Sequence, residues 1–333
     1  MAKPLNISVL NLVPVREGKD ATGAIEDMIT LARHVDGSDY QRYWISEHHN
    51  MRTLASSATR MLIQHTLEHT DEIRVGSGGV MLPNHSPLIV AEEFGTMHAI
   101  HGDRLDIGLG RAPGTDMQTA SAIRRNNHDG VFSFSNEIEE LQRYLSDYPG
   151  HVIAYPGLGS NIPVYVLGSS TDSAYVAAKL GLPYAFAAHF APTHMEEAFK
   201  IYEREFEPSK QLDKPYKMAS LNVICADTNE EAEYIKTTHY FNILNLIRNE
   251  RKPLRAPVES MEGEWNEREE YAVKTQFPIA FSGDEDKALE ELRAFQTQFN
   301  VDEVMAVSYI YDMDACLKSY DIFENVVKRY NES

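Results

Sequence analysis

A carboxylate followed by two imidazoles is the most chemically promising feature of this sequence. Glu47, His48 and His49 follow an apolar run of strand-forming residues, Tyr43 to Ser46. Polar groups at the end of a buried strand must find partners or perform chemistry, because leaving water without a partner costs free energy. Successive side chains of an extended chain point to opposite sides, so only one of the two histidines can face the interior. An imidazole titrates near neutral pH and therefore suits proton transfer. We expect Glu47 to orient or pair with a neighbour rather than to act as an acid.

A second candidate is an anion-binding site at Gly168-Ser169-Ser170-Thr171. The glycine permits a tight turn, and the hydroxyl residues precede a predicted helix whose free N–H groups and dipole attract an anion such as phosphate. The alternative is an ordinary helix N-cap, the commoner use of such residues. Asp172 weakens the anion hypothesis slightly, because it already places negative charge in the first turn.

Arg111 strengthens the phosphate hypothesis. It ends another predicted strand, and its guanidinium could form a bidentate contact with the same phosphate. The alternative is a salt bridge to Asp103, Asp106 or Asp116, and the sequence leaves both interpretations open.

Three glycines, Gly76, Gly78 and Gly79, fall within one predicted strand. Glycine weakens a strand, so their presence indicates either close approach of a flat ligand to the backbone or a bulge or crowded barrel layer. A second glycine group, Gly108-Leu109-Gly110, is no dinucleotide-binding fingerprint, because Pro113 takes the third glycine position and no helix begins there.

Two histidine pairs have a spacing that metal sites use. His65 and His69 are four residues apart, and His98 and His101 three. Neither pair is accompanied by a carboxylate in a zinc-binding pattern, and both fall on the bodies or ends of predicted helices. We therefore expect no metal.

The elements that must position these residues alternate between strand and helix along the chain. Strands are predicted over residues 6–13, 43–46, 73–82, 103–110, 163–168, 184–188, 217–226 and 303–308. Helices are predicted over residues 22–35, 56–70, 87–100, 135–145, 171–180, 193–206, 229–247, 286–299 and 315–330. This alternation indicates an α/β protein with a parallel sheet. A doubly wound sheet could also hold eight strands, but the length favours a (β/α)8 TIM barrel with insertions at 112–131, after strand 4, and 251–283, between strands 7 and 8. We predict one barrel domain over residues 1–333, with the candidate residues gathered at the carboxyl ends of its strands.

Composition restricts the possible functions further. The chain of 333 residues carries a net charge of −19, which disfavours binding to nucleic acid or to an anionic membrane. No apolar run approaches the roughly 20 residues that a membrane helix needs. The two cysteines, Cys225 and Cys316, are far apart, which fits a reducing cytoplasm. We expect a cytoplasmic enzyme.

Several of these stretches together resemble the bacterial luciferase-like family of flavin-dependent monooxygenases, in its single-subunit branch. The similarity rests on residues 46–49, 75–87, 108–114 and 168–170, with Ser173-Ala174 and 181–183. It extends from Ile7 to about Pro192 and is weaker over 195–300.

The resemblance implies a barrel that binds reduced FMN, or deazaflavin F420 in some branches. His48 matches the catalytic base beside the flavin, and Gly78-Gly79 matches a pair joined by a cis peptide against the flavin ring. Arg111 and the residues Gly168, Ser169, Ser170 and Thr171 match the phosphate-binding arginine and loop, and His189 falls in a pocket-lining segment. Glycines replace the alanines that often contact the ring, which leaves the seating of the ring open.

The activity implied is attack of the reduced flavin on O2 to give a peroxyflavin, followed by oxidation of a small organic substrate. A separate NAD(P)H:flavin reductase is expected, because no nicotinamide fingerprint is visible, and a homodimer is expected from the family. The alternatives are an F420- or NAD(P)H-linked flavin oxidoreductase without oxygen insertion and a non-catalytic flavin-binding barrel. The two insertions are interpreted as lids, and their sequences do not identify the substrate.

Overall fold

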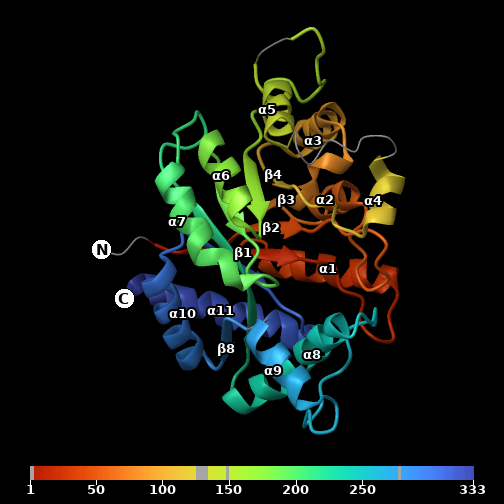
Figure 1. Ribbon diagram of the computed structural model, residues 1–333, viewed down its shortest axis with the longest axis vertical. Helices are drawn as coiled ribbons and strands as arrows, with labels where there is room; N and C mark the ends of the chain where they lie inside the picture. The colour runs from red at the N-terminus through yellow and green to blue at the C-terminus, as the bar shows by residue number, and fades with distance from the viewer. Residues whose placement is uncertain (1–3, 125–133, 148–149, 277–278) are drawn as a thin grey trace.

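Eight parallel strands close into a barrel, and helices surround it (Figure 1). The computed structural model describes residues 4–124, 134–147, 150–276 and 279–333. Each barrel strand pairs with its neighbours in the chain, and β9 pairs with both β7 and β1 to complete the ring. The strands are β1 (Asn6–Asn11), β2 (Tyr40–Ile45), β3 (Arg74–Met81), β4 (Leu105–Gly110), β5 (Val164–Gly168), β6 (Tyr184–Phe186), β7 (Lys217–Cys225) and β9 (Glu303–Val307). The predicted TIM barrel is confirmed.

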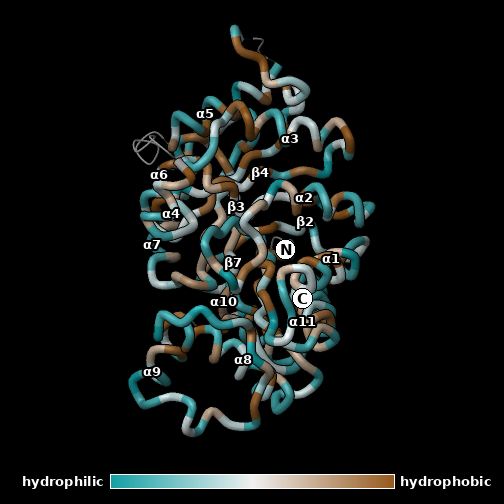
Figure 2. The backbone as a smooth tube through the Cα atoms, turned by 90° about the vertical axis from the view of Figure 1, so that its right-hand side faces the viewer, coloured by the Kyte–Doolittle hydropathy of each residue, from teal (hydrophilic) through white to brown (hydrophobic). Residues whose placement is uncertain are grey.

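The helices of the outer layer follow the strands in order. They are α1 (Ala21–Val35), α2 (Thr59–Leu67), α3 (Pro87–His101), α5 (Phe134–Leu145), α6 (Thr171–Leu180), α7 (Met195–Glu205), α8 (Asn229–Ile247), α10 (Glu285–Phe299) and α11 (Met313–Glu332), with short 3-10 turns at Leu82–Asn84 and Pro192–His194. The last helix packs against α1 (Figure 2). This contact brings the chain ends together, and the Leu5 backbone N–H donates to Asn331 Oδ1 at 2.8 Å. Among the described residues, no helix has both the length and the apolar character needed to span a membrane.

Local sequence explains where several helices begin. Asp20, Thr228, Asp284 and Asp312 each precede a helix, and each side chain accepts a hydrogen bond from the backbone N–H three residues ahead. Such caps satisfy one of the N–H groups that a helix start leaves without an intrahelical partner. The start of α6 differs, because its N-cap residue Ser170 makes no side-chain capping bond.

Three elements in the predicted insertions were missed. Helix α4 (Met117–Arg124) lies in the first insertion, whose residues 125–131 fall outside the described ranges. Helix α9 (Glu267–Gln276) and the short strand β8 (Phe281–Gly283), which pairs with the end of β7, lie in the second. The second insertion is therefore not irregular throughout, as predicted. Helix α9 begins with Glu267, Glu269 and Glu270 and has little apolar periodicity, so it carries no core-facing pattern to detect.

Strand β2 begins three residues earlier than predicted, and the added segment includes a buried charged residue, Arg42. Arg42 lies inside the barrel, with Nε 2.8 Å from Glu303 Oε1 and Nη1 2.9 Å from Asp106 Oδ2. Its Nη1 also donates to Tyr165 Oη at 2.7 Å. All three partners come from other strands, near the amino ends of β4, β5 and β9. This network fills the base of the barrel, the end where residues contribute to stability rather than to catalysis.

Candidate active site

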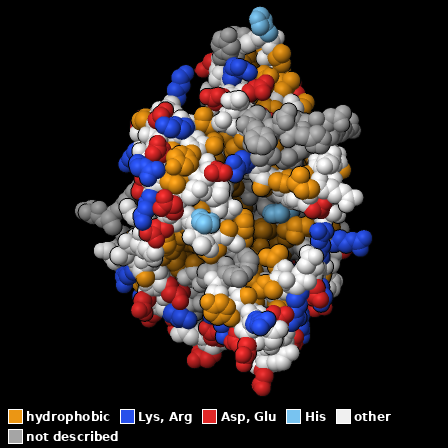
Figure 3. Space-filling model, viewed as in Figure 1, with side chains coloured by type: hydrophobic (Ala, Val, Ile, Leu, Met, Phe, Trp, Pro, Cys, Tyr) orange, Lys and Arg blue, Asp and Glu red, His pale blue; other side chains and the backbone are white. Residues whose placement is uncertain are grey.

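His48 lies at the carboxyl end of β2, on the side of the strand that faces the barrel interior. Trp44, four residues earlier, belongs to the apolar cluster inside the barrel. His48 Nδ1 is 3.1 Å from Ser46 Oγ, which is 3.1 Å from Ser56 Oγ, and both serines are buried. Figure 3 shows a hollow at the centre of one face of the molecule, with hydrophobic side chains inside it and histidines at its margin.

Burial lowers the pKa of His48 to about 4, against the pull of Glu47, which acts in the opposite direction. At neutral pH the ring is therefore uncharged. The sequence suggested a group that titrates near working pH, whereas this environment gives a neutral imidazole with a lone pair available to take a proton.

Glu47 points away from the interior and connects two loops. Its Oε1 accepts from His49 Nε2 and from His85 Nε2, both at 2.8 Å, and its Oε2 accepts from the Met81 backbone N–H at 3.2 Å. The side chain is buried, and these hydrogen bonds outweigh its desolvation and lower its pKa to about 2. Glu47 thus pairs with its neighbours, as predicted. His49 is engaged with Glu47, so the two histidines have different partners.

The partner of His85 also sets its tautomer. Arg60 Nη2 lies 3.3 Å from His85 Nδ1, and a guanidinium can only donate, so Nδ1 is the acceptor of this hydrogen bond. Nε2 therefore carries the ring hydrogen and donates it in the hydrogen bond to Glu47. Sequence reasoning omitted His85 from the site, although it follows the glycine-rich strand. The spacing between Glu47 and His85 gave no signal, because only the neighbouring positions of β2 and β3 bring them together.

Gly78 and Gly79 are joined by a cis peptide bond, as expected from the resemblance. A Cβ atom on Gly78 would lie 2.4 Å from Leu10 Cδ1 and 3.1 Å from Trp44 Cβ, and one on Gly79 would lie 2.7 Å from the Gly108 carbonyl oxygen. The crowded-layer interpretation of this strand is therefore supported by the packing. Gly78 is partly exposed beside Leu10 and Trp44, whereas Gly79 is buried.

Arg111 and the start of α6 lie next to each other. Arg111 Nη2 is 3.1 Å from Asp172 Oδ2, in the first turn of α6, and both side chains are partly exposed. The salt-bridge alternative predicted Asp103, Asp106 or Asp116 as the partner, and the structure has Asp172 instead. As predicted, the Arg111 guanidinium lies beside the start of α6.

The residues Gly168, Ser169, Ser170 and Thr171 form the turn between β5 and α6. A Cβ atom on Gly168 would lie 1.9 Å from Ser173 Oγ, so the turn requires a glycine. The Ser173 hydroxyl donates to the Ser170 carbonyl at 2.7 Å, which fixes the turn without capping the helix N–H groups. The ordinary N-cap interpretation is therefore wrong for the Ser170 side chain.

His189 follows β6 and is buried at 7% exposure. Its backbone carbonyl accepts from Asn222 Nδ2 at 2.8 Å, and its ring contacts that of Phe190, with centroids 4.9 Å apart. Burial lowers its pKa to about 3, and the nearby rings of His48 and His239 act in the same direction. The structure thus places His189 close enough to His48 for their charges to interact.

Both insertions contact the loop that carries His48. Arg251 Nη1 donates to the Asn50 carbonyl at 2.5 Å, and Asn50 Nδ2 donates to Asp116 Oδ2 at 3.1 Å. The backbone N–H of His49 donates to the Gly114 carbonyl at 3.2 Å. The loop after β2 therefore joins the first insertion to the second.

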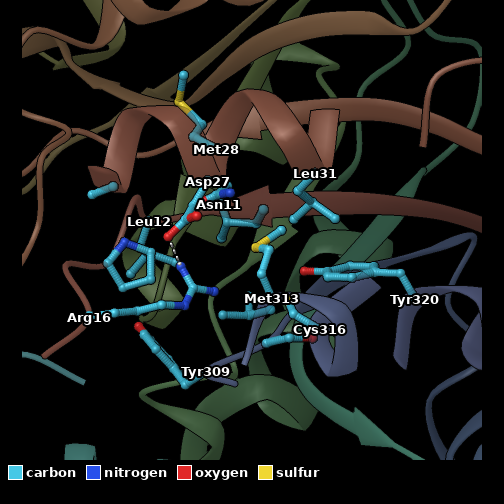
Figure 4. Close-up of a pocket in the computed structure, with 15 residues that line it drawn as sticks. Asn11, Leu12, Arg16, Asp27, Met28, Leu31, Tyr309, Met313, Cys316 and Tyr320 are labelled. Carbon is cyan, nitrogen blue, oxygen red and sulfur yellow. Dashed lines mark hydrogen bonds and ion pairs between the residues drawn. The ribbon is translucent and has the colours of Figure 1, made fainter. Parts of the chain in front are cut away.

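A separate crevice lies between β1, α1, the end of β9 and α11 (Figure 4). Its charged groups are Arg16 and Asp27, with Arg16 Nη1 2.9 Å from Asp27 Oδ2. Nε and Nη2 of Arg16 donate to the Tyr311 and Ile310 carbonyls. All three guanidinium nitrogens thus have protein partners, and Arg16 joins the loops after β1 and β9. We assign this crevice a structural role.

The histidine pairs on helices have local partners. The rings of His65 and His69 contact each other, with centroids 4.4 Å apart, and His98 Nε2 lies 2.8 Å from Asp103 Oδ1. Across the described residues, no three or more histidine, cysteine, aspartate or glutamate side chains are grouped so that they could hold a metal ion.

Solved structures with this fold bind more than one cofactor. The oxygenating constituent of 3,6-diketocamphane monooxygenase from Pseudomonas putida, in complex with FMN, has a TM-score of 0.72 at 15% identity and covers 97% of each chain. An F420-dependent secondary alcohol dehydrogenase, in complex with an F420-acetone adduct, has a TM-score of 0.64 at 13% identity and covers 98% of each chain. At these identities the likeness concerns the fold alone.

More similar relatives include a luciferase-like monooxygenase of Escherichia coli, 40% identical, with 97% of each chain covered. The N-acetyl-S-alkylcysteine monooxygenase of Bacillus subtilis is 28% identical, covering 97% of this chain and 98% of its own. The crystal structure of apo-MsnO8 has a TM-score of 0.86 at 30% identity and covers 97% of this chain and 98% of its own. The family model for luciferase-like monooxygenases matches residues 5–299, and the chain belongs to this family.

Proposed function

We propose that this protein is a flavin-dependent monooxygenase that uses reduced FMN and O2 to oxidise a small organic substrate. The observation that carries the proposal is the arrangement at the carboxyl ends of the strands. A neutral imidazole, His48, faces the interior there, and the same rim holds the uncapped start of α6 beside Arg111. The first group can accept a proton, and the second can bind a phosphate.

The residues present suit FMN at its phosphate end. The first N–H groups of α6 lack a side-chain cap. Arg111 would supply a guanidinium in place of its contact with Asp172. Both side chains of that ion pair are partly exposed, so exchanging it for a phosphate contact costs little.

The ring end has apolar and backbone surfaces that suit a flat cofactor. Gly78 and Gly79 would contact the ring through their backbone, with Leu10 and Trp44 beneath. His189 would contribute to the wall of this pocket. FMN, when bound in its reduced form, supplies the electrons that activate O2.

The role of the protein is to position the reactants, exclude water and move one proton. In the tautomer that donates its Nδ1 hydrogen to Ser46 Oγ, the lone pair at Nε2 of His48 can accept a proton from the bound reactants. Ser46 and Ser56, both buried, hold the ring in this orientation. The two insertions, joined through Asn50, would cover the entrance.

The proposal includes partners. The reduced flavin would come from a separate NAD(P)H:flavin reductase, and the protein would work as a homodimer in the cytoplasm. Both cysteines are free and buried, which fits a reducing compartment.

The test is oxygen consumption by purified protein supplied with reduced FMN and a panel of aldehydes, thioethers and aromatic compounds. The panel includes an N-acetyl-S-alkylcysteine, because a relative is named for this substrate. Absorbance titration with FMN, reduced FMN and F420 identifies the cofactor. Substrate-dependent oxygen uptake with reduced FMN supports the proposal. Binding of F420 with no oxygen uptake would replace it with a deazaflavin oxidoreductase, and flavin binding without turnover of any kind would favour a binding barrel.

We expect His48→Ala to bind FMN normally and to lose turnover by at least about 100-fold, the usual contribution of a general base. His98→Ala is the matched control, because His98 pairs with Asp103 beyond the end of α3 and lies outside the proposed site. Full turnover by His48→Ala would refute the catalytic assignment.

A further inference from the structure

One buried nitrogen near His48 has no hydrogen-bond partner. Within the ranges that the structure describes, His189 Nδ1 makes no hydrogen bond, and the atom is shielded from solvent. An unsatisfied buried polar atom costs about 1–3 kcal/mol, so such atoms are rare in folded proteins and call for an explanation.

The surroundings of His189 determine which kind of group could satisfy that atom. Residue Phe186 of β6 is in register with Ala219 of β7, which brings the chain after β6 alongside Ser220. The Ser220 backbone carbonyl interacts with the His189 ring and favours a hydrogen on the nitrogen that faces it. Nδ1 is the unpartnered nitrogen, so the hydrogen belongs to Nε2, and Nδ1 of the neutral ring presents a lone pair.

The position of His189 is also fixed. Asn222 Nδ2 holds its backbone carbonyl at 2.8 Å, and the Phe190 ring packs against the imidazole. Ser220 and Asn222 lie on the same side of β7 as Met218, a member of the apolar cluster inside the barrel. The Nδ1 lone pair is thus an acceptor held in a fixed position near His48.

We propose that His189 Nδ1 accepts a hydrogen bond from an N–H or O–H group of a bound ligand, and that this contact selects ligands that carry such a donor. The inference rests on the proposed function, and it adds a chemical requirement to it. Two ligands could supply the donor. Reduced FMN carries a ring N–H that oxidised FMN lacks, and a substrate could carry an amide N–H or a hydroxyl group.

Two variants with side chains of similar size distinguish the loss of a hydrogen-bond acceptor at position 189 from a loss of packing. His189→Leu removes the acceptor, and His189→Asn keeps an amide oxygen that can accept. Thermal unfolding and circular dichroism establish first that both variants fold. Affinities for oxidised and reduced FMN are then measured anaerobically. Titration calorimetry of FMN-loaded protein uses N-acetyl-S-methylcysteine and its N-methylated analogue as the substrate pair.

If the reduced cofactor is the donor, His189→Leu loses at least tenfold in affinity for reduced FMN and little for oxidised FMN. If the substrate is the donor, His189→Leu loses at least tenfold for the N–H compound alone, and both flavin affinities stay unchanged. In either case His189→Asn recovers part of the loss. If Nδ1 contacts only an internal water, the affinity of reduced relative to oxidised FMN and that of the N–H compound relative to its N-methylated analogue stay as in the wild type. That result overturns the proposal.

A ligand-free measurement keeps this inference separate from the proposed function. The 15N chemical shifts of the His189 ring report which nitrogen carries the hydrogen, with His189→Asn as the assignment control. A hydrogen on Nδ1 overturns the proposal whether or not flavin binds. Failure of the wild-type protein to bind any flavin would instead remove the proposed function, while the ring shifts would still test Nδ1 as an acceptor.

Discussion

Replacing Glu47 by glutamine should destabilise the protein strongly although the side chain keeps its size. The carboxylate accepts three hydrogen bonds, from His49, His85 and the Met81 backbone. A glutamine has one amide oxygen, and its NH2 group would face N–H donors that need an acceptor. The substitution should therefore lower the free energy of unfolding in two ways: it removes the favourable charge, and it leaves at least one buried group without a hydrogen bond.

The lowered pKa of Glu47 gives the magnitude. A fall of the pKa from its ordinary value of 4.5 to about 2 corresponds to about 3 kcal/mol of folding free energy. Because the folded pKa is the lower one, this contribution is fully present above pH 4.5 and is lost as the pH falls toward 2. We expect Glu47→Gln to lower the free energy of unfolding at pH 7.5 by about 3 kcal/mol.

The assay is urea unfolding at equilibrium, followed by fluorescence, with the slope of the transition checked for each variant. Glu196→Gln is the matched control, because Glu196 pairs with Lys200 on the exposed side of α7, where an ion pair contributes little to stability. A loss below about 1 kcal/mol in Glu47→Gln, equal to that of the control, would refute the idea that this carboxylate joins the two loops.

Two further predictions follow from the site. The pKa values of His48 and His189, lowered by burial to about 4 and about 3, mean that the unfolded chain takes up protons below pH 6.5 while the folded protein does not. Stability should fall by up to about 4 kcal/mol between pH 7.5 and pH 5. His189→Leu should remove about half of this dependence, and a flat unfolding free energy in the wild type would contradict the assignment. Arg111→Met should weaken FMN binding at least tenfold and leave riboflavin, which has no phosphate, unaffected; equal effects in fluorescence titrations would exclude phosphate contact.

The sequence predicted the barrel because each strand and helix is recognisable from its own residues. Alternation of strand and helix implies a parallel sheet, and a parallel barrel gathers its strand ends on one face. The neighbourhood of Arg111 and α6 followed from this rule alone. The ion-pair partner of Arg111 could not be predicted in this way, because Asp172 lies 61 residues away and several nearer aspartates were equally plausible.

The rest could not be predicted because it depends on pairings between distant residues. The start of β2 was predicted too late, because a charged residue such as Arg42 indicates solvent exposure unless its partners are known. Its partners Asp106 and Glu303 are 64 and 261 residues away. The same holds for His85, whose bond to Glu47 spans 38 residues. Local patterns identify elements, whereas buried charges are explained only by the assembled barrel.

The two sides of the chain after β2 have different roles, and this division explains why a carboxylate stands beside two histidines. Ser46 and His48 share one side and form the hydrogen-bonded pair that faces the interior. Glu47 and His49 share the other side and bind the loops after β3 and β4. A proton acceptor must keep a fixed position, yet a neutral ring with one hydrogen bond cannot hold its own loop. The Glu47 carboxylate and its hydrogen-bond partners do so from outside the pocket, so the carboxylate stabilises the site without contacting the reactants.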